Sequence, residues 1–273
     1  MHINCKGNLI DLSSPKVMGI LNLTPDSFYD GGKYKNPTEV LKQVEKMLTD
    51  GATFIDVGAY SSRPGADHIS EEKEKQRLLP ILNEIIKHFP DILISVDTFR
   101  SGVASAAVSE GATIINDISA GNLDTDMMKV VAQLQVPYIM MHMKGTPQNM
   151  KKMTSYSDLI EEVNFYFSEK LHQAKQYGIN DCIIDPGFGF AKNTAQNYQL
   201  LQYLNALQFH QTPILVGISR KSMIYKILET KPSEALNGTS VLNTIALQNG
   251  AHILRVHDVK EASEVIQLLA QFN

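Results

Sequence analysis

Three polar residues of this chain stand at the ends of apolar segments and could hold a ligand by hydrogen bonds. Asp97 ends ISVD, Asn116 lies in IINDIS, and Asp185 precedes Pro-Gly in IIDPGFGF. A carboxylate at such a place needs a donor, because its burial without a partner is costly. Apolar residues from the same kind of segment complete the set: Ile118, Met141 and Phe190. The combination predicts a pocket for a flat heterocycle rich in N–H groups, although Asp185 would also suit a turn.

The alternation of side chains along a strand indicates which of these residues face a common site. Neighbouring residues point to opposite faces, whereas residues two apart share one. Asn116 and Asp117 therefore cannot both face the site, and we expect Asn116, which has donor and acceptor atoms, to do so. Arg255 and His257 share a face in RVHD and form a cationic pair suited to phosphate oxygens. His257 alone would more often be structural.

The segment SRKSM supplies a further cation and a hydroxyl group. Lys221 would contact a ring carbonyl or nitrogen, form a Schiff base or bind phosphate, and these alternatives stay open. Ser222 lies near the expected start of a helix, whose free N–H groups attract an anion such as a carboxylate. A solvated Arg-Lys pair is the alternative interpretation.

A second set of oxygen-bearing residues predicts an anion site with a divalent cation. Asn22 ends an early apolar segment, and SSRPG contributes Ser62 and Arg63. With Arg255 and His257 they would surround phosphate groups, to which Mg²⁺ is commonly bridged by a few protein oxygens. The sequence contains no HExxH, Cys/His cluster or GxxxxGK[ST], which disfavours zinc hydrolysis and P-loop chemistry.

Eight apolar segments, each followed by a helix-like stretch, must position these residues. The spacing of about 34 residues per unit is typical of an α/β fold, the TIM (β/α)8 barrel, with its active site at the carboxyl ends of the strands. The segments are 17–27, 54–59, 94–99, 114–119, 138–143, 183–190, 214–221 and 253–258. The helices are expected at 37–49, 70–88, 100–109, 125–134, 156–177, 194–206, 233–249 and 259–271.

The remaining segments predict a cap and two long loops. Residues 1–15 are expected to form a short N-terminal hairpin-like cap around Gly7, and no Pro/Ser-rich linker divides the chain. We therefore expect one domain over residues 1–273. The loops 23–38 and 59–70 are longer than such connections require and would lie over the barrel mouth, with surface decoration as the alternative.

Composition narrows the class of function. The chain has 273 residues, 43% of them hydrophobic and 20% charged, and a formal net charge of −4. It can bury a large core, and it has no basic excess that would indicate nucleic acid as a partner. Cys5 and Cys182 lack metal-ligand or CxxC spacing, and Cys182, which opens an apolar segment, is expected to be a buried thiol. No signal peptide or membrane span is expected, so we expect a cytoplasmic location.

Eight stretches of the chain resemble the dihydropteroate synthase family, the folate-pathway target of sulfonamides. They are MGILNLTPDSFYDGG, DVGAYSSRPGA, SVDT, IINDIS, MHM, DPGFGFAKN, VGISRKSM and AHILRVHDVKE, in the family's order from about residue 17 to 261. The resemblance implies a TIM-barrel enzyme that condenses a hydroxymethyl-dihydropterin diphosphate with 4-aminobenzoate and releases pyrophosphate. It also implies Mg²⁺ as cofactor, sulfonamides as competitors and a homodimer.

The resemblance also implies a role for each matched residue. Asp97, Asn116, Asp185 and Lys221 would hold the pterin ring, with Ile118 and Met141 packed near it. Asn22 would ligate Mg²⁺, and Ser62, Arg255 and His257 would bind the diphosphate. Phe190, Pro64 and Ser222 would form the aminobenzoate pocket, and Arg63 would join Asp97, Asp185 and Lys221 in catalysis. The family's usual STRPG is SSRPG here, so Ser62 keeps the hydroxyl but lacks a methyl group. That change would affect loop packing or sulfonamide contacts rather than activity.

Three other functions remain as alternatives. A class I aldolase would use Lys221 for a Schiff base but leaves Asn22 and the Arg255/His257 pair without roles. A pterin-dependent methyltransferase would not need SSRPG, SRKSM and RVHDV together. A non-catalytic pterin-binding paralogue would be expected to lack part of the diphosphate site. For the synthase we expect dissociative loss of pyrophosphate without a covalent enzyme intermediate.

Overall fold

The computed structural model describes residues 1–23, 37–61 and 68–272. Eight parallel strands form the central sheet: β3 (Lys16–Asn22), β4 (Phe54–Gly58), β5 (Leu93–Asp97), β6 (Ile114–Asp117), β7 (Tyr138–Met141), β8 (Cys182–Asp185), β9 (Leu215–Val216) and β10 (Ile253–Val256). Their order is β8-β7-β6-β5-β4-β3-β10-β9, and a parallel bridge between Ile184 and Ile214 joins the two edges. The sheet is therefore a closed barrel, which confirms the predicted fold class.

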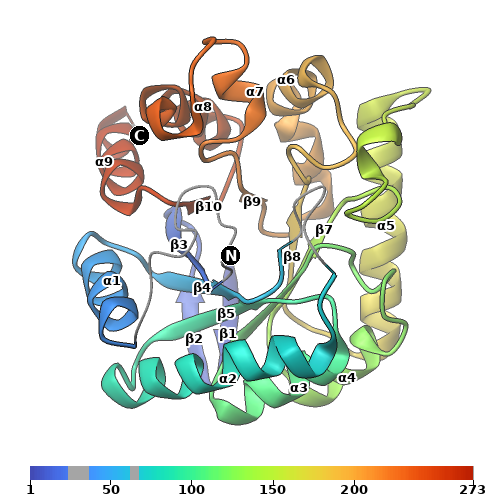
Figure 1. Cartoon of the computed structure of the whole chain (residues 1–273). Coiled ribbons are helices and arrows are strands. Elements are labelled where there is room, and N and C mark those ends of the chain that lie inside the picture. Colours follow the sequence, from blue (N-terminus) through green and yellow to red (C-terminus); the bar gives the residue numbers. More distant parts are fainter. Residues whose placement is uncertain (24–36, 62–67, 273) are drawn as a thin grey trace.

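Helices surround this barrel on its outside, in chain order (Figure 1). They are α1 (Pro37–Thr49), α2 (Glu71–His88), α3 (Ser101–Glu110), α4 (Met127–Leu134), α5 (Leu159–Tyr177), α6 (Thr194–Gln202), α7 (Ser222–Tyr225), α8 (Leu236–Gln248) and α9 (Val259–Leu269). Short 3-10 helices are η1 (Met150–Lys152), η2 (Leu204–His210), η3 (Pro232–Glu234) and η4 (Ala270–Phe272). In the ranges described, no helix has the length and apolar character needed to cross a bilayer.

The predicted helices agree with the observed ones to within a few residues, and local capping explains the differences. Helix α5 begins at Leu159 rather than at 156 because the Asp158 side chain accepts hydrogen bonds from the N–H groups of Ile160 and Glu161. Helix α6 ends at Gln202, and the chain continues as the 3-10 helix η2 over the rest of the predicted stretch.

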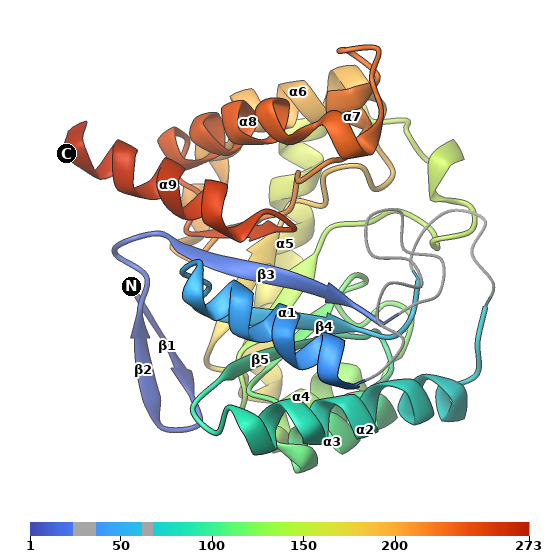
Figure 2. The ribbon, with the colours of Figure 1, turned by 60° about the vertical axis from the view of Figure 1, so that its left-hand side comes forward.

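A two-stranded hairpin closes the amino end of the barrel. Strands β1 (His2–Cys5) and β2 (Asn8–Asp11) pair antiparallel, as the cap prediction requires. Ile3, Cys5 and Leu12 are buried. They pack in one cluster with inward residues near the amino ends of seven barrel strands: Met18, Phe54, Ile114, Ile139, Ile183, Leu215 and Ile253. The hairpin lies at the end opposite to the carboxyl ends of the strands (Figure 2). The hairpin therefore covers the amino end of the barrel core.

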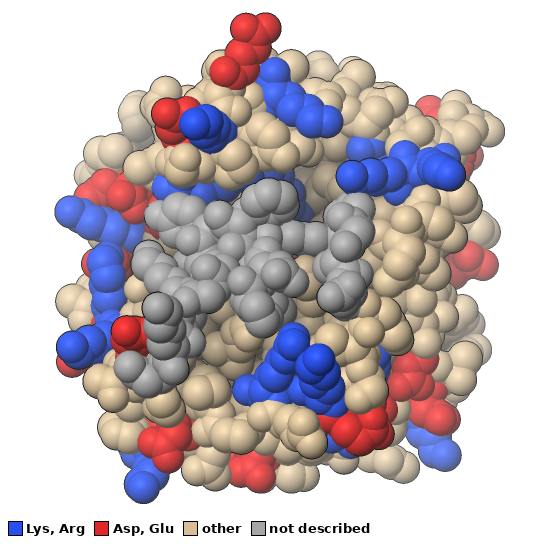
Figure 3. Space-filling model, viewed as in Figure 1, with Lys and Arg blue, Asp and Glu red and all other residues tan. Residues whose placement is uncertain are grey.

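Strand register brings the polar strand ends to one level. Asn22 is the register partner of Gly58, Gly58 of Asp97, and Asp97 of Asn116. A Cβ on Gly58 would lie 3.4 Å from the Cβ of Asp97, so the glycine leaves room for the carboxylate. Around this face Lys and Arg side chains alternate with Asp and Glu over the surface that is described (Figure 3). The polar residues Asn22, Asp97 and Asn116 therefore lie side by side at the carboxyl end of the barrel.

Candidate active site

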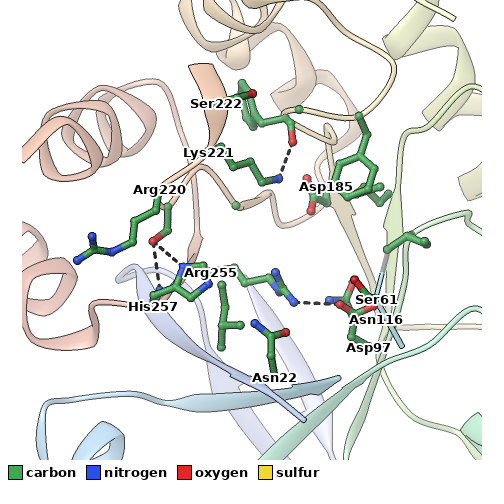
Figure 4. A pocket seen from close by; sticks show the side chains of 18 of the residues that line it. Asn22, Ser61, Asp97, Asn116, Asp185, Arg220, Lys221, Ser222, Arg255 and His257 are labelled. Carbon is green, nitrogen blue, oxygen red and sulfur yellow. Dashed lines mark hydrogen bonds and ion pairs between the residues drawn. The ribbon is translucent and has the colours of Figure 1, made fainter. Parts of the chain in front are cut away.

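A cavity of ≈ 270 Å³ opens at the carboxyl end of the barrel. Eleven of the predicted residues line it: Asn22, Asp97, Asn116, Ile118, Met141, Asp185, Phe190, Lys221, Ser222, Arg255 and His257. Ten of the lining residues are labelled in Figure 4, where they come from barrel strands and from the segments that follow the strands. The other predicted residues, Ser62, Arg63 and Pro64, lie outside the described residues.

A buried ion-pair network forms the wall of the cavity at β4, β5 and β10. The Arg255 Nε donates to Asp56 Oδ2 at 2.6 Å, and its Nη2 donates to Asp97 Oδ2 at 3.0 Å. The Asn116 Nδ2 donates to the same Asp56 oxygen at 3.1 Å. Asn116 lines the cavity while Asp117 is buried and bonded to the hydroxyl group of Tyr138. The orientation predicted from strand alternation is therefore confirmed.

Burial shifts the pKa values of the ionisable groups in the cavity. It raises the pKa of Asp97 to about 7, against the lowering effect of Arg255 and together with the negative charge of Asp56. It also raises the pKa of Asp185, with Lys221 acting in the opposite direction. The pKa of Lys221 falls to about 8, because desolvation outweighs the attraction of Asp185. Groups with such perturbed pKa values, gathered in one cavity, are typical of a catalytic site.

The turn after β8 places one acid and one aromatic ring on the cavity. Asp185 Oδ1 accepts from the N–H of Gly187 at 2.8 Å, so this residue both forms the turn and lines the cavity. Gly187 has a φ of 70°, and a Cβ there would lie 2.1 Å from the carbonyl oxygen of His142. Only glycine fits this position, and the turn brings Phe190 over the cavity.

Two lysines hold this turn by its carbonyl groups. Lys221 Nζ donates to the carbonyl of Phe188 at 2.5 Å and lies 4.9 Å from the centre of the Phe190 ring. Lys192 Nζ donates to the carbonyls of Gly187 and Phe190, both at 3.1 Å. Burial lowers the pKa of Lys192 to about 7. Lys221 lines the cavity, so a ligand bound there could replace the Phe188 carbonyl as its hydrogen-bond acceptor.

Ser219, Arg220 and Lys221, between β9 and α7, all line the cavity, but the Arg220 guanidinium is directed to Asp258. Arg220 has a φ of 54° and points away from the other labelled residues (Figure 4). Its guanidinium forms a bidentate pair with Asp258 at 2.8 Å for both bonds, so the adjoining Ser219 and Lys221 face the cavity. Ser219 Oγ lies 3.1 Å from His257 Nδ1 and accepts from the backbone N–H of His257.

The helix after Lys221 is short. Helix α7 spans four residues, and its first residue is Ser222. Such a short helix has little dipole, because the field depends on aligned peptide groups. An anion at this place would be held by the Ser222 hydroxyl and by free backbone N–H groups rather than by a long helix.

The residues fit Mg²⁺ only in part. Over the described ranges, no three His, Cys, Asp or Glu side chains gather in a way that could hold a metal ion. The Asn22 side chain lines the cavity and makes no hydrogen bond within those ranges. One amide oxygen suits Mg²⁺, which often takes its remaining ligands from phosphate and water. Mg²⁺ would therefore be held here together with a diphosphate rather than before it.

Comparison with known proteins identifies the family. The model of the pterin binding enzyme family matches residues 18–257. The Escherichia coli dihydropteroate synthase is 43% identical over 271 residues, which cover 98% of this chain and 95% of that protein. The chain belongs to the dihydropteroate synthase family.

Solved structures of the dihydropteroate synthase family have the same fold. A Yersinia pestis dihydropteroate synthase in complex with a sulfonamide drug superimposes with a TM-score of 0.96 at 41% identity, covering 100% of this chain and 99% of that one. A Xanthomonas albilineans dihydropteroate synthase with 4-aminobenzoic acid gives a TM-score of 0.91 at 35% identity, covering 99% and 97%. This agreement over nearly the whole chain confirms the family inferred from the sequence.

Within this family member, the structure adds residues that the sequence analysis missed. Asp56 was not named, although strand alternation in FIDVG puts it on the same face as Gly58. Ser219 and Arg220 lie in the quoted SRKSM segment, but their opposite orientations depend on the positive φ of Arg220. The sequence assigned Asp97 to the pterin ring and Arg255 to the diphosphate. The structure does not separate these two residues, because they form an ion pair.

Proposed function

We propose that this chain condenses (7,8-dihydropterin-6-yl)methyl diphosphate with 4-aminobenzoate to give 7,8-dihydropteroate and pyrophosphate. One observation carries the proposal: a single cavity contains both hydrogen-bond acceptors and cations. Asp97, Asn116 and Asp185 provide the acceptors, while Lys221 and Arg255 provide the cations. A pterin diphosphate has the matching halves, a ring edge rich in N–H groups and an anionic tail.

The acidic residues would bind the pterin and stabilise the charge that develops on it. The methylene C–O bond breaks, pyrophosphate leaves with the bonding pair, and the positive charge spreads into the electron-rich dihydropterin. Asp97 and Asp185, as carboxylates, would stabilise this charge in a site of low dielectric, where such an interaction is strong. Ile118 and Met141 line the same cavity and would pack on the ring.

The cationic residues would bind the diphosphate. The Arg255 Nη1 has no hydrogen-bond partner among the described residues and so remains available to a phosphate oxygen. His257 lines the same cavity and is held by Ser219. Mg²⁺, bound through Asn22 and the diphosphate, would neutralise charge on the leaving group. Ser62 is proposed as a further diphosphate ligand on the strength of the family pattern alone.

The second substrate would enter beside Phe190 and Ser222. Its aromatic ring would contact Phe190, and its carboxylate would accept from the Ser222 hydroxyl and nearby backbone N–H groups. The amine nitrogen then forms the new C–N bond and releases its proton to water. Pro64 and Arg63 are proposed for the same pocket and for catalysis. An aromatic amine is weakly basic and mostly unprotonated at neutral pH, so it needs little general-base assistance.

The decisive experiment is a coupled assay for pyrophosphate release. Release should require the pterin diphosphate, 4-aminobenzoate and Mg²⁺ together, and dihydropteroate should form in equal amount. Binding of the pterin diphosphate without any release would instead establish a non-catalytic pterin-binding protein. Lys221→Ala and Asp97→Ala should each reduce turnover severely, and a near-normal rate in either would remove that residue from the proposed mechanism.

The aldolase and methyltransferase alternatives give different results. An aldolase would form a Schiff base on Lys221 that borohydride reduction traps and mass spectrometry locates. A corrinoid-dependent methyltransferase would release no pyrophosphate under any condition. The bond between Lys221 Nζ and the Phe188 carbonyl supports a role in binding rather than covalent attack. We expect no adduct.

The proposal includes a homodimer. Helices α8 and α9 pack against each other and expose apolar side chains: Val241, Ile245 and Leu268. Exposed apolar surface of this kind often marks a protein interface. Light scattering after gel filtration should give a mass of twice 30.4 kDa, whereas a mass of 30.4 kDa would refute the dimer.

The proposal also includes action in the cytoplasm. Both cysteines are free thiols, and burial raises the pKa of Cys5 and of Cys182 to about 12, which leaves them unreactive. Free thiols are usual in a reducing compartment. Fractionation of source cells, followed by the pyrophosphate assay, tests this location.

A further inference from the structure

Asp56 lies one layer below the cavity and contacts two residues that line it. It is fully buried on β4 and faces the barrel interior, while Ile55 and Val57 pack in the outer core. Its Oδ2 accepts from Arg255 at 2.6 Å and from Asn116 at 3.1 Å. Its Oδ1 is buried and makes no hydrogen bond within the described ranges. Within the described ranges, the carboxylate is therefore held by these two contacts.

The contact with Asp56 determines which way the Asn116 amide points. An ionised carboxylate offers only acceptor atoms, so the amide must turn its NH₂ group toward Asp56. The amide oxygen is then directed away from Asp56, and it has no hydrogen-bond partner among the described residues. The cavity thus presents the Asn116 oxygen next to the Asp97 carboxylate, and the Asp185 carboxylate lines the same cavity. All three are acceptors, which suits a ligand edge made of N–H donors.

The same carboxylate fixes the guanidinium group of Arg255. Two N–H groups of Arg255 are bound to two carboxylates on neighbouring strands, which sets the plane of the guanidinium. Asp97 accepts from Arg255 through Oδ2 only, and within the described residues its Oδ1 makes no hydrogen bond and can accept from a ligand.

We propose that Asp56 is a positioning residue that determines specificity. It orients the Asn116 oxygen into the cavity and holds Arg255, and the cavity thereby selects a ring edge of N–H donors. The identity of the ring as a dihydropterin rests on the proposed function. Asp56 itself does not contact the substrate and acts through Asn116 and Arg255.

The first test is Asp56→Asn, which keeps the shape but loses the charge. An amide at residue 56 can accept or donate, so Asn116 would no longer be forced into one orientation, and Arg255 would lose one charged partner. The KM for the pterin diphosphate should rise at least about tenfold, the effect of one lost charge-assisted hydrogen bond, and kcat should fall. The KM for 4-aminobenzoate should stay within about twofold. Equal changes in both KM values would overturn the proposal.

A matched control removes a different buried carboxylate. Asp117 follows Asn116 on β6 but faces outward, where it accepts from Ser119, Gly121 and Tyr138. Asp117→Asn should lower the stability of the barrel and leave the KM for the pterin diphosphate within about twofold. A rise in that KM equal to the rise in Asp56→Asn would overturn the proposal, since loss of any buried carboxylate would then suffice.

The sharpest test exchanges the two side chains. Asn116→Asp alone places two buried carboxylates against each other and should impair binding strongly. In the double variant Asp56→Asn/Asn116→Asp, the amide at residue 56 can donate to the carboxylate at residue 116, which still presents an oxygen to the cavity. The double variant should bind the pterin diphosphate at least about tenfold more tightly than Asn116→Asp, because contacting residues couple. Additive losses would overturn the proposal.

Calorimetric binding of the pterin diphosphate, without 4-aminobenzoate, separates this proposal from the proposed function. If the unmodified chain binds the compound but releases no pyrophosphate, only the proposed function fails, and the exchange of Asp56 and Asn116 is still measured as an affinity. If the unmodified chain does not bind it, both proposals are overturned.

Discussion

The pair formed by Arg220 and Asp258 offers the clearest test of how the structure supports its cavity. Asp258 follows the cavity residue His257, and Arg220 precedes the cavity residue Lys221. The pair therefore connects the two segments that carry these cavity residues. The side chains are 6% and 9% exposed, and two bonds of 2.8 Å join them. Arg220 also donates to the carbonyls of Pro232 and Ser233. We predict that Asp258→Asn destabilises the protein strongly.

The magnitude follows from two independent considerations. Each charge-assisted hydrogen bond contributes about 1.5–3 kcal/mol, so the loss of two gives about 3–6 kcal/mol. Breaking a buried ion pair by removing one partner typically costs about 3–5 kcal/mol, because the remaining charge stays buried. The two values agree at about 3–5 kcal/mol. At ~2–4 °C per kcal/mol, the melting temperature should fall by roughly 6–20 °C.

Urea unfolding, followed by circular dichroism, measures this free energy, and α9 itself supplies the control. Lys260 and Glu264 form an exposed pair at 3.9 Å, with side chains 64% and 54% exposed. Glu264→Gln should change the free energy of unfolding by no more than about 0.5 kcal/mol. If Asp258→Asn costs as little as Glu264→Gln, the reasoning from burial and bidentate geometry is wrong.

Three further predictions follow from the same structure. The plot of kcat/KM against pH should be bell-shaped. Its acid limb should lie near pH 7, because Asp97 is a carboxylate only above its pKa of about 7. Its alkaline limb should lie near pH 8, because Lys221 is protonated only below its pKa of about 8. Lys221→Arg should be less active, and its pH profile should lack the alkaline limb, because arginine stays protonated in this range. If the limb is unchanged after correction for substrate ionisation, the limb does not report Lys221. Cys5 and Cys182 should resist a thiol reagent at pH 8 until the protein unfolds, since their pKa is about 12; fast labelling of the native protein would contradict this. Leu12→Ala should cost about 2–5 kcal/mol of stability and leave kcat/KM unchanged, because the hairpin packs at the closed end of the barrel; a large loss of kcat/KM would contradict that separation.

Much of the fold and part of the candidate site could be predicted from the sequence because they depend on residues close together in the chain. Continuous apolar segments alternating with helix-like stretches predicted the barrel, and strand alternation predicted that Asn116 rather than Asp117 faces the cavity. These patterns are local: side-chain direction repeats every two residues in a strand and every 3.6 in a helix. The polar strand ends were recognisable for the same reason.

Contacts between distant strands were decided only by the tertiary structure. Arg255 meets Asp56 across 199 residues, and that contact exists because β10 and β4 both flank β3 in the closed sheet. The outward turn of Arg220 depends on one positive φ, and the four-residue helix α7 lies outside the helix ranges predicted from the sequence. Local alternation shows which face a side chain takes. Its partners across the barrel depend on strand register and ring closure, which bring together residues that no sequence pattern relates.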